Sequence, residues 1–197
     1  MALTARQAAA RLTALRAAIP TAARQALTVV GGNAVRYLKE HELTGGSLGV
    51  RSGRLRNSVG LEMGQDAAGL TVRVFAGRGE GVNYAGIHEH GGTITPKRGR
   101  FLAIPVGPAR TPSGVARGGW ESPRTAPVKL RFVPIRGGSM GRLVIDRKTR
   151  SETAYLLVRS VRIKPKHFMA RTQALALSAM PAAFSDRVKA AIVRIVG

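Results

Sequence analysis

Cysteine is absent from the 197-residue chain, which excludes disulfide bonds and any metal site built on thiolates. Aromatic residues make up only 5% of the sequence, so the hydrophobic core must consist mainly of aliphatic and alanine side chains. No stretch approaches the roughly 20 consecutive apolar residues that a transmembrane helix needs. Arginines also interrupt the first 20 residues, and we therefore expect neither a membrane span nor a signal peptide.

Acidic residues are scarce as well, at 10 against 32 lysines and arginines, which leaves a net charge of +22. A net charge of this size attracts polyanions, and the like charges within the chain repel one another. We therefore expect DNA or an acidic protein nearby. The basic residues concentrate in residues 97–150, a stretch that contains 13 of them and only two carboxylates. No helix-turn-helix, zinc finger or aromatic platform accompanies them, which favours non-specific backbone contact over sequence readout. The candidate contacts to DNA or a partner are Lys97, Arg98 and Arg100, which share one Gly- and Pro-containing loop.

The order of hydrophobic periodicities predicts one α+β domain over residues 1–197. Residues 1–42 and 166–196 carry the three-and-four spacing that is typical of amphipathic helices. Alternating segments within 55–106 and 128–163 are typical of strands. Because no long helix separates these strands, we expect one antiparallel sheet that packs against helices from both termini.

Both helical regions contain residues that disturb a helix. Pro20 and Pro181 are expected to break or kink them, because proline cannot donate the helical hydrogen bond. Gly31 and Gly32 weaken the first helix, and they predict close approach to a neighbouring element. The helical residues expected in the core are Leu27, Val30, Ala34, Leu38, Leu175, Val188 and Ile192.

Residues 107–127 contain four prolines and four glycines, and this composition predicts an extended arm outside the core. Trp120, the only tryptophan, lies within it. A lone tryptophan on an arm suggests an anchor in a neighbouring subunit, with Arg117 and Arg124 beside it. Packing of Trp120 onto its own domain is the alternative.

The few titratable groups form no catalytic motif in the sequence. The ten carboxylates form no recognisable pair, and the densest cluster is His88, Glu89 and His90. Two histidines at i and i+2 cannot share one helix face as in the HExxH zinc site, although they could do so on a strand. The glycine-rich stretches also lack the lysine and the flanking elements of a phosphate loop. We therefore expect no catalytic site, metal or cofactor.

Four segments, in this order along the chain, resemble a known family. They are RSGRLRNSVG (51–60), YAGIHEHGGTITPKRGRFLAIPV (84–106), VKLRFVPI (128–135) and VRIKPKHFM (161–169). Together they are similar to the tail-completion, or neck, proteins of tailed bacteriophages, which include virion-morphogenesis and minor tail proteins. The matching residues, all expected to be structural, are Gly53, Leu55, Arg56, Ser58, Tyr84, Ile87, His88, Glu89, Gly91, Gly92, Pro105 and Phe168.

The resemblance implies a structural protein of the virion, made in the cytoplasm of a bacterial host. It would complete the tail end at the head–tail junction as a homo-oligomeric ring, of about six subunits, through which DNA passes. Other neck and tail proteins would be its partners, together with non-specific contacts to the genomic DNA. A tail terminator or stopper ring of the same neck, and a free non-specific nucleic-acid-binding protein, remain as alternatives.

Overall fold

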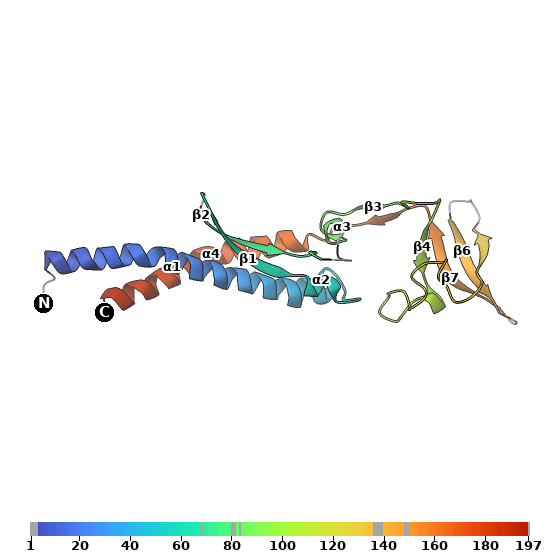
Figure 1. The fold of residues 1–197 in the computed structure, drawn as a ribbon, viewed down its shortest axis with the longest axis horizontal. Coiled ribbons are helices and arrows are strands. Elements are labelled where there is room, and N and C mark those ends of the chain that lie inside the picture. The colour runs from blue at the N-terminus through green and yellow to red at the C-terminus, as the bar shows by residue number, and fades with distance from the viewer. Residues whose placement is uncertain are drawn as a thin grey trace. The chain divides into compact units, whose positions relative to one another are not determined.

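The computed structural model describes residues 4–67, 69–79, 82, 84–135, 140–147 and 150–196. It has an α+β fold, with long helices near both termini and antiparallel strands between them (Figure 1). The chain forms two compact units, where the sequence predicted one domain. The helical unit comprises Met1–Leu48, Arg54–Ala85 and His167–Gly197, and the sheet unit comprises Gly49–Gly53 and Gly86–Lys166. The division arises because the long central segment builds a hydrophobic core of its own.

Two long helices, α1 (Ala5–Tyr37) and α4 (Phe168–Val196), run side by side in the helical unit (Figure 1). Thr4 caps α1: its side chain accepts a hydrogen bond from the Gln7 backbone N–H, and the Gln7 side chain bonds back to the Thr4 backbone. A π-helical segment, η1 (Leu38–Gly46), continues α1, and the four-residue helix α2 (Arg54–Asn57) follows.

Neither proline ends its helix, so the predicted break is wrong at both positions. Pro20 lies inside α1 and Pro181 inside α4. Each proline removes one hydrogen bond to the carbonyl four residues earlier, which belongs to Arg16 or to Leu177. Both of these residues are exposed. Packing between the two helices keeps them continuous despite the lost hydrogen bond.

A β-hairpin covers one side of α1. Strands β1 (Gly60–Asp66) and β2 (Gly69–Phe75) pair antiparallel, with Leu61 opposite Val74. The close approach predicted at the two glycines of α1 occurs at Gly31, where a Cβ would lie 2.6 Å from Leu61 Cδ1 and 2.7 Å from Val72 Cγ2. At Gly32 a Cβ would meet nothing within 4 Å, so only the first glycine is required by packing.

The core of the helical unit lies where η1, α2, the hairpin and the start of α4 meet. Its buried members are Leu38, Leu43, Leu55, Val59 and Phe168. In the N-terminal helical region the prediction is confirmed for Val30 and Ala34 of α1 and for Leu38 of η1, whereas Leu27 is only half-buried. On α4 it is wrong for Leu175 and Ile192, each 41% exposed, and Val188 is half-buried. The C-terminal helix therefore leaves much of its apolar surface uncovered.

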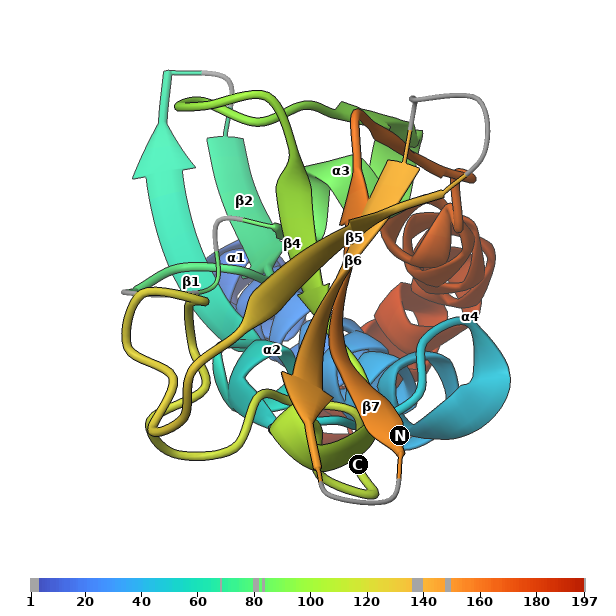
Figure 2. The ribbon, with the colours of Figure 1, turned by 90° about the vertical axis from the view of Figure 1, so that its right-hand side faces the viewer.

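The sheet unit contains a four-stranded antiparallel sheet in the order β4-β7-β6-β5 (Figure 2). A short helix, α3 (Ala85–His90), leads into the unit, where β3 and β8 form a separate two-stranded ribbon. Within the described residues, the predicted single sheet is thus three separate sheets. The β1–β2 hairpin packs on α1. The strands are β3 (Gly92–Ile94), β4 (Leu102–Pro105), β5 (Arg131–Pro134), β6 (Met140–Asp146), β7 (Ser151–Val158) and β8 (Val161–Ile163).

Residues 107–127 are a folded loop rather than an extended arm. The loop begins with a 3-10 turn, η2 (Gly107–Ala109), and a bridge joins Arg110 to Ala116. Ala109 and Trp120 enter the core of the sheet unit with Ala154 and Tyr155 of β7. The arm prediction was wrong because backbone turns and one large aromatic side chain compensate for the lack of regular structure.

Candidate interaction surface

The predicted contact residues Lys97, Arg98 and Arg100 lie together in the loop that joins β3 to β4. All three side chains are exposed. Gly99, between them, has φ +82°, a left-handed conformation that glycine adopts without strain. Among the residues that the structure describes, none of the three forms an ion pair. The loop therefore presents three cations to solvent within four residues.

The charge of the sheet unit is strongly unbalanced. It holds 18 basic and 4 acidic residues, a balance of +14. Two of the acids neutralise neighbours on the sheet: Arg131 Nε lies 2.6 Å from Asp146 Oδ2, and Arg147 Nε lies 3.2 Å from Glu152 Oε2. Hydrogen bonds from Arg131 and Ser151 lower the pKa of Asp146 to about 2. With these acids engaged, the remaining cations can attract an anionic partner over a broad surface.

Trp120 packs inside its own unit and does not lie on an extended arm. Its indole is buried, and the ring lies 6.2 Å from that of Tyr155, centroid to centroid. The Tyr155 hydroxyl donates a 2.8 Å hydrogen bond to the Trp120 carbonyl. Arg117 Nε donates to the Arg110 carbonyl, and Arg124 is exposed in a turn. The structure thus agrees with the alternative in which Trp120 packs on its own domain, and not with the prediction of an intersubunit anchor.

The first motif segment builds the junction between α2 and the hairpin. Gly53 precedes α2 with φ +70°, and Leu55 is buried in the core. Arg56 Nε donates a 3.1 Å hydrogen bond to the Lys39 carbonyl of η1. Ser58 Oγ donates to the Leu55 carbonyl at 2.7 Å and accepts from the Gly77 backbone N–H at 2.8 Å. These contacts give the matched residues structural roles.

The second motif segment includes α3 and the two glycines after it. The His88 carbonyl accepts a 2.8 Å hydrogen bond from the Lys166 backbone N–H. A Cβ on Gly91, whose φ is +73°, would lie 2.8 Å from Pro165 Cδ, so only glycine fits where these two segments of the chain approach each other. Gly92 then begins β3 and pairs with Ile163. The segment joins α3 to the approach to β8.

His88 and Glu89 do not form a metal site with His90. Glu89 is buried, His88 is half-buried and His90 is exposed, so the three side chains face different surroundings. Within the described ranges, no group of three or more His, Asp or Glu side chains is placed to hold a metal ion. Burial lowers the pKa of His88, and the positive charges of Arg51 and Lys166 lower it further.

The other matched residues lie in the interior of their units or at a strand end. Phe168, the first residue of α4, is fully buried, and Tyr84 packs against the same core. Ile87 is half-buried in α3. Pro105 ends β4 opposite Tyr155. Each position is accounted for by packing or pairing.

Sequence reasoning missed an ion pair in the helical unit, in which a buried carboxylate meets a half-exposed arginine. Glu42, with a side chain only 6% exposed, accepts hydrogen bonds from Arg171 Nε at 2.9 Å and Nη2 at 2.7 Å. Tyr37 and Ser47 donate to the same carboxylate. These hydrogen bonds lower the pKa of Glu42 to about 2, with Arg171 the largest cause, and burial opposes them.

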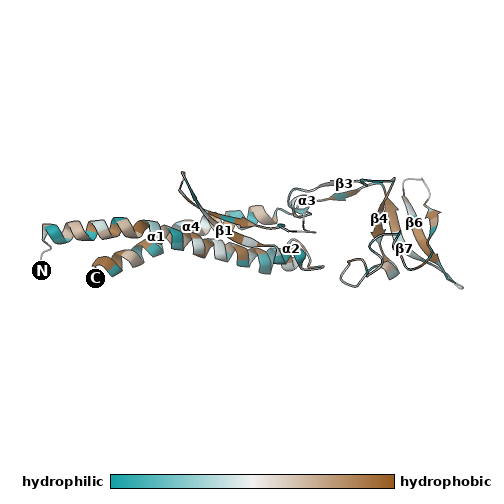
Figure 3. Ribbon diagram, in the orientation of Figure 1, coloured by the Kyte–Doolittle hydropathy of each residue, from teal (hydrophilic) through white to brown (hydrophobic). Residues whose placement is uncertain are grey.

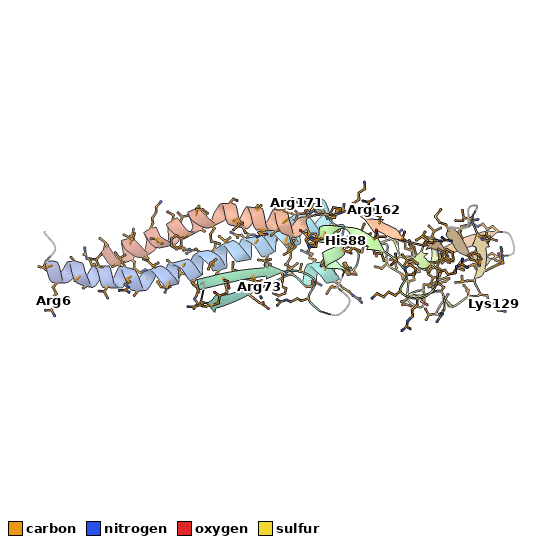
Figure 4. The ribbon with its side chains drawn as sticks, turned by 90° about the horizontal axis from the view of Figure 1, so that it is seen from above. Arg6, Arg73, His88, Lys129, Arg162 and Arg171 are labelled. Carbon is orange, nitrogen blue, oxygen red and sulfur yellow. The ribbon has the colours of Figure 1, made fainter. Side chains whose placement is uncertain are left out.

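The pair connects η1 to the first turn of α4, near the end of the helical pair that is remote from Arg6 (Figure 4). One signal in the sequence could have revealed it. Glu42 follows Leu38 by four residues, so it lies on the apolar stripe of a predicted helix, where a carboxylate requires a partner.

No protein-family model, curated protein or solved structure matches the chain. In the part of the chain that the structure describes, no helix combines the length and the apolar character needed to cross a bilayer.

Proposed function

We propose that the chain is a non-enzymatic structural component of a tailed-phage particle, which completes the tail end at the head–tail junction as a ring through which DNA passes. One observation carries the proposal: four segments that resemble the tail-completion family occur in the family's order, and their residues serve turns, strand ends and cores. An enzyme would instead place such a set of residues around a pocket with acids, bases or nucleophiles.

Charge supports a place on the axis of the particle. A ring of six copies, each with a net charge of +22, would carry about +132. Such an assembly is stable only beside compensating negative charge, from DNA in the lumen or from acidic proteins above and below. The loop with Lys97, Arg98 and Arg100 offers three unneutralised cations for that contact.

The experiment is a triple charge reversal, Lys97→Glu, Arg98→Glu and Arg100→Glu, introduced into a phage that depends on this chain. Loss of joined heads and tails identifies a contact with an acidic protein, and normal particles with slow or leaky DNA release identify the lumen. The matched control reverses Arg159, Arg162 and Lys164, three exposed cations of the same unit. If particle assembly and DNA release both remain normal in the first variant, the loop has no such role.

Two alternative functions can be distinguished from this one by different measurements. A tail terminator or stopper ring would use the same fold at a neighbouring level of the neck, and imaging of the particle would distinguish the levels. A free nucleic-acid-binding protein is favoured by the +14 balance of the sheet unit. Such a protein would bind duplex DNA with a steep salt dependence and would be missing from purified particles.

A further inference from the structure

A shallow cleft of about 230 Å³ lies between α1 and α4, within the helical unit. Its floor includes the buried side chains of Ala22 and Ala191. Polar side chains from both helices stand around it: Thr21 and Gln25 from α1, and Arg187 and Arg194 from α4. The small alanines on the floor let polar groups approach from both sides.

The polar lining of the cleft is suited to an anion. Thr21, Gln25 and the two arginines all carry hydrogen-bond donors, and no carboxylate lines the cleft. Among the described residues, neither Arg187 nor Arg194 forms an ion pair. Asp186, the preceding residue, projects about 100° away around the helix, and it forms no ion pair with Arg187 among the described residues. The two guanidinium groups are therefore available to an external carboxylate or phosphate.

The surface around the cleft is apolar as well as basic. Val29 follows Gln25 by four residues and Phe184 precedes Arg187 by three, so helical spacing extends the lining stripe with these two side chains. They are 38% and 39% exposed. Figure 3 shows apolar positions, in brown, along the C-terminal part of α4. An uncovered surface that mixes apolar side chains with arginine is typical of a protein-binding face.

Charge decides what can cover this face. The 33 residues of α1 include five arginines and no acidic residue, and Asp186 is the single acid of α4. A second copy that used the same face would place arginines against arginines, so self-association here is disfavoured. Duplex DNA would satisfy the arginines but would leave Phe184 and Val29 against phosphates and water.

We propose that this cleft is the docking groove for an acidic amphipathic helix of a different protein. Arg187 and Arg194 are seven residues apart, which spans two turns or roughly 10 Å of helix. They would bind two carboxylates at a similar spacing on the partner, whose apolar stripe covers Phe184, Val29 and the alanine floor. The inference does not depend on the proposed role in a phage particle.

The test uses the full chain and a synthetic helical peptide that carries two glutamates seven residues apart beside a leucine stripe. We expect binding by isothermal titration calorimetry, weakened about tenfold or more by Arg187→Gln with Arg194→Gln. The matched control, Arg16→Gln with Lys189→Gln, removes the same charge from exposed positions outside the cleft and should change affinity by less than about twofold. Circular dichroism checks that both double variants keep their helices.

Three results would overturn the proposal. The first is equal binding of a peptide in which both glutamates are replaced by glutamine. The second is an equal loss of affinity in the control variant, which would mean attraction by net charge alone. The third is a finding that duplex DNA binding or self-association of the chain, rather than peptide binding, depends on Arg187 and Arg194.

Discussion

The helical unit and the sheet unit differ in how far their few acids offset the basic residues. The helical unit has 14 basic and 6 acidic residues, and it buries Glu42 in a network with Arg171 at the start of α4. The sheet unit has 18 basic and 4 acidic residues; Glu89 is buried, and Asp146 and Glu152 pair with arginines. In one unit a carboxylate stabilises the fold. In the other, carboxylates neutralise some arginines and leave the 95–101 loop positively charged.

The two units also differ in how the chain builds them. Three separate segments of the chain assemble the helical unit, and the contacts between the first and the last include α1 against α4. The sheet unit is nearly continuous in sequence, and its core includes a loop that carries a single tryptophan. Removing one side chain from either core should therefore affect mainly the unit in which it lies, and amide hydrogen exchange can report on each unit of the intact protein.

The largest effect is expected from Trp120→Ala. Removing a buried tryptophan from the small core over β7 should destabilise the sheet unit by about 3 kcal/mol. Hydrogen exchange should show lost protection in β4, β6 and β7, with α1 and α4 unchanged. Val128→Ala, at a 40% exposed position near the end of the same loop, is the control and should change little. Equal loss of protection in both units would mean that they unfold as one.

The next largest effect is expected from Arg171→Gln in the helical unit. It leaves the Glu42 carboxylate buried without its main partner, which should cost about 2 kcal/mol. Protection should fall in η1 and in the first turns of α4, while the sheet unit is unaffected. Arg6→Gln, which removes an exposed arginine from α1, serves as the control. A stability equal to that of the control would show that the network adds nothing.

A smaller effect separates the two adjacent glycines of α1. Gly31→Ala gains about 1 kcal/mol of helix propensity, but its methyl group meets Leu61 and Val72 of the hairpin, so we expect net destabilisation of about 1 kcal/mol. Gly32→Ala meets nothing and should stabilise by about 0.5–1 kcal/mol. Urea denaturation measures both changes. The same sign for both variants would contradict the packing of β1 and β2 on α1.

The smallest effect is a difference in the pH at which each unit weakens. The pKa of His88 is lowered in the folded chain, so the unfolded chain binds the proton more readily. The sheet unit should therefore lose stability as pH falls below about 6.5, the ordinary pKa of histidine. His88→Gln should remove this dependence, as followed by hydrogen exchange at several pH values.

The helical unit should lose stability at a lower pH than the sheet unit, because its pH dependence comes from Glu42. Its folded pKa of about 2 lies below the ordinary value of 4.5, so its contribution is complete above pH 4.5 and disappears as pH falls toward 2. Arg171→Gln should flatten this part of the profile. If the helical unit weakened first on acidification, the assignment of the two windows would be wrong.

The fold class could be predicted because it depends on local patterns. Helical spacing at Val30, Ala34 and Leu38, and alternation at 70–75, lead directly to α1 and β2. Long-range compensation could not be predicted in this way. Pro20 and Pro181 stay helical because a second helix packs beside each of them, and the 107–127 loop folds because Trp120 reaches Tyr155. Sequence patterns depend on residues that are close together along the chain, so they do not predict such long-range contacts.

The same limit explains what could be predicted of the candidate sites. The loop with Lys97, Arg98 and Arg100 is visible in the sequence because its residues are adjacent. Arg187 and Arg194 meet Thr21 and Gln25 only when α4 returns along α1, so that cleft could not be predicted from the sequence.

The assembly state of the full chain tests the central claim most directly. Native mass spectrometry should be carried out after equilibration at high ionic strength, where a Debye length of about 3 Å at 1 M salt screens the repulsion between subunits. The ring account predicts a closed species of six 20.9 kDa chains, near 125 kDa. A monomer at every protein concentration, or an open-ended series of oligomers, would contradict it.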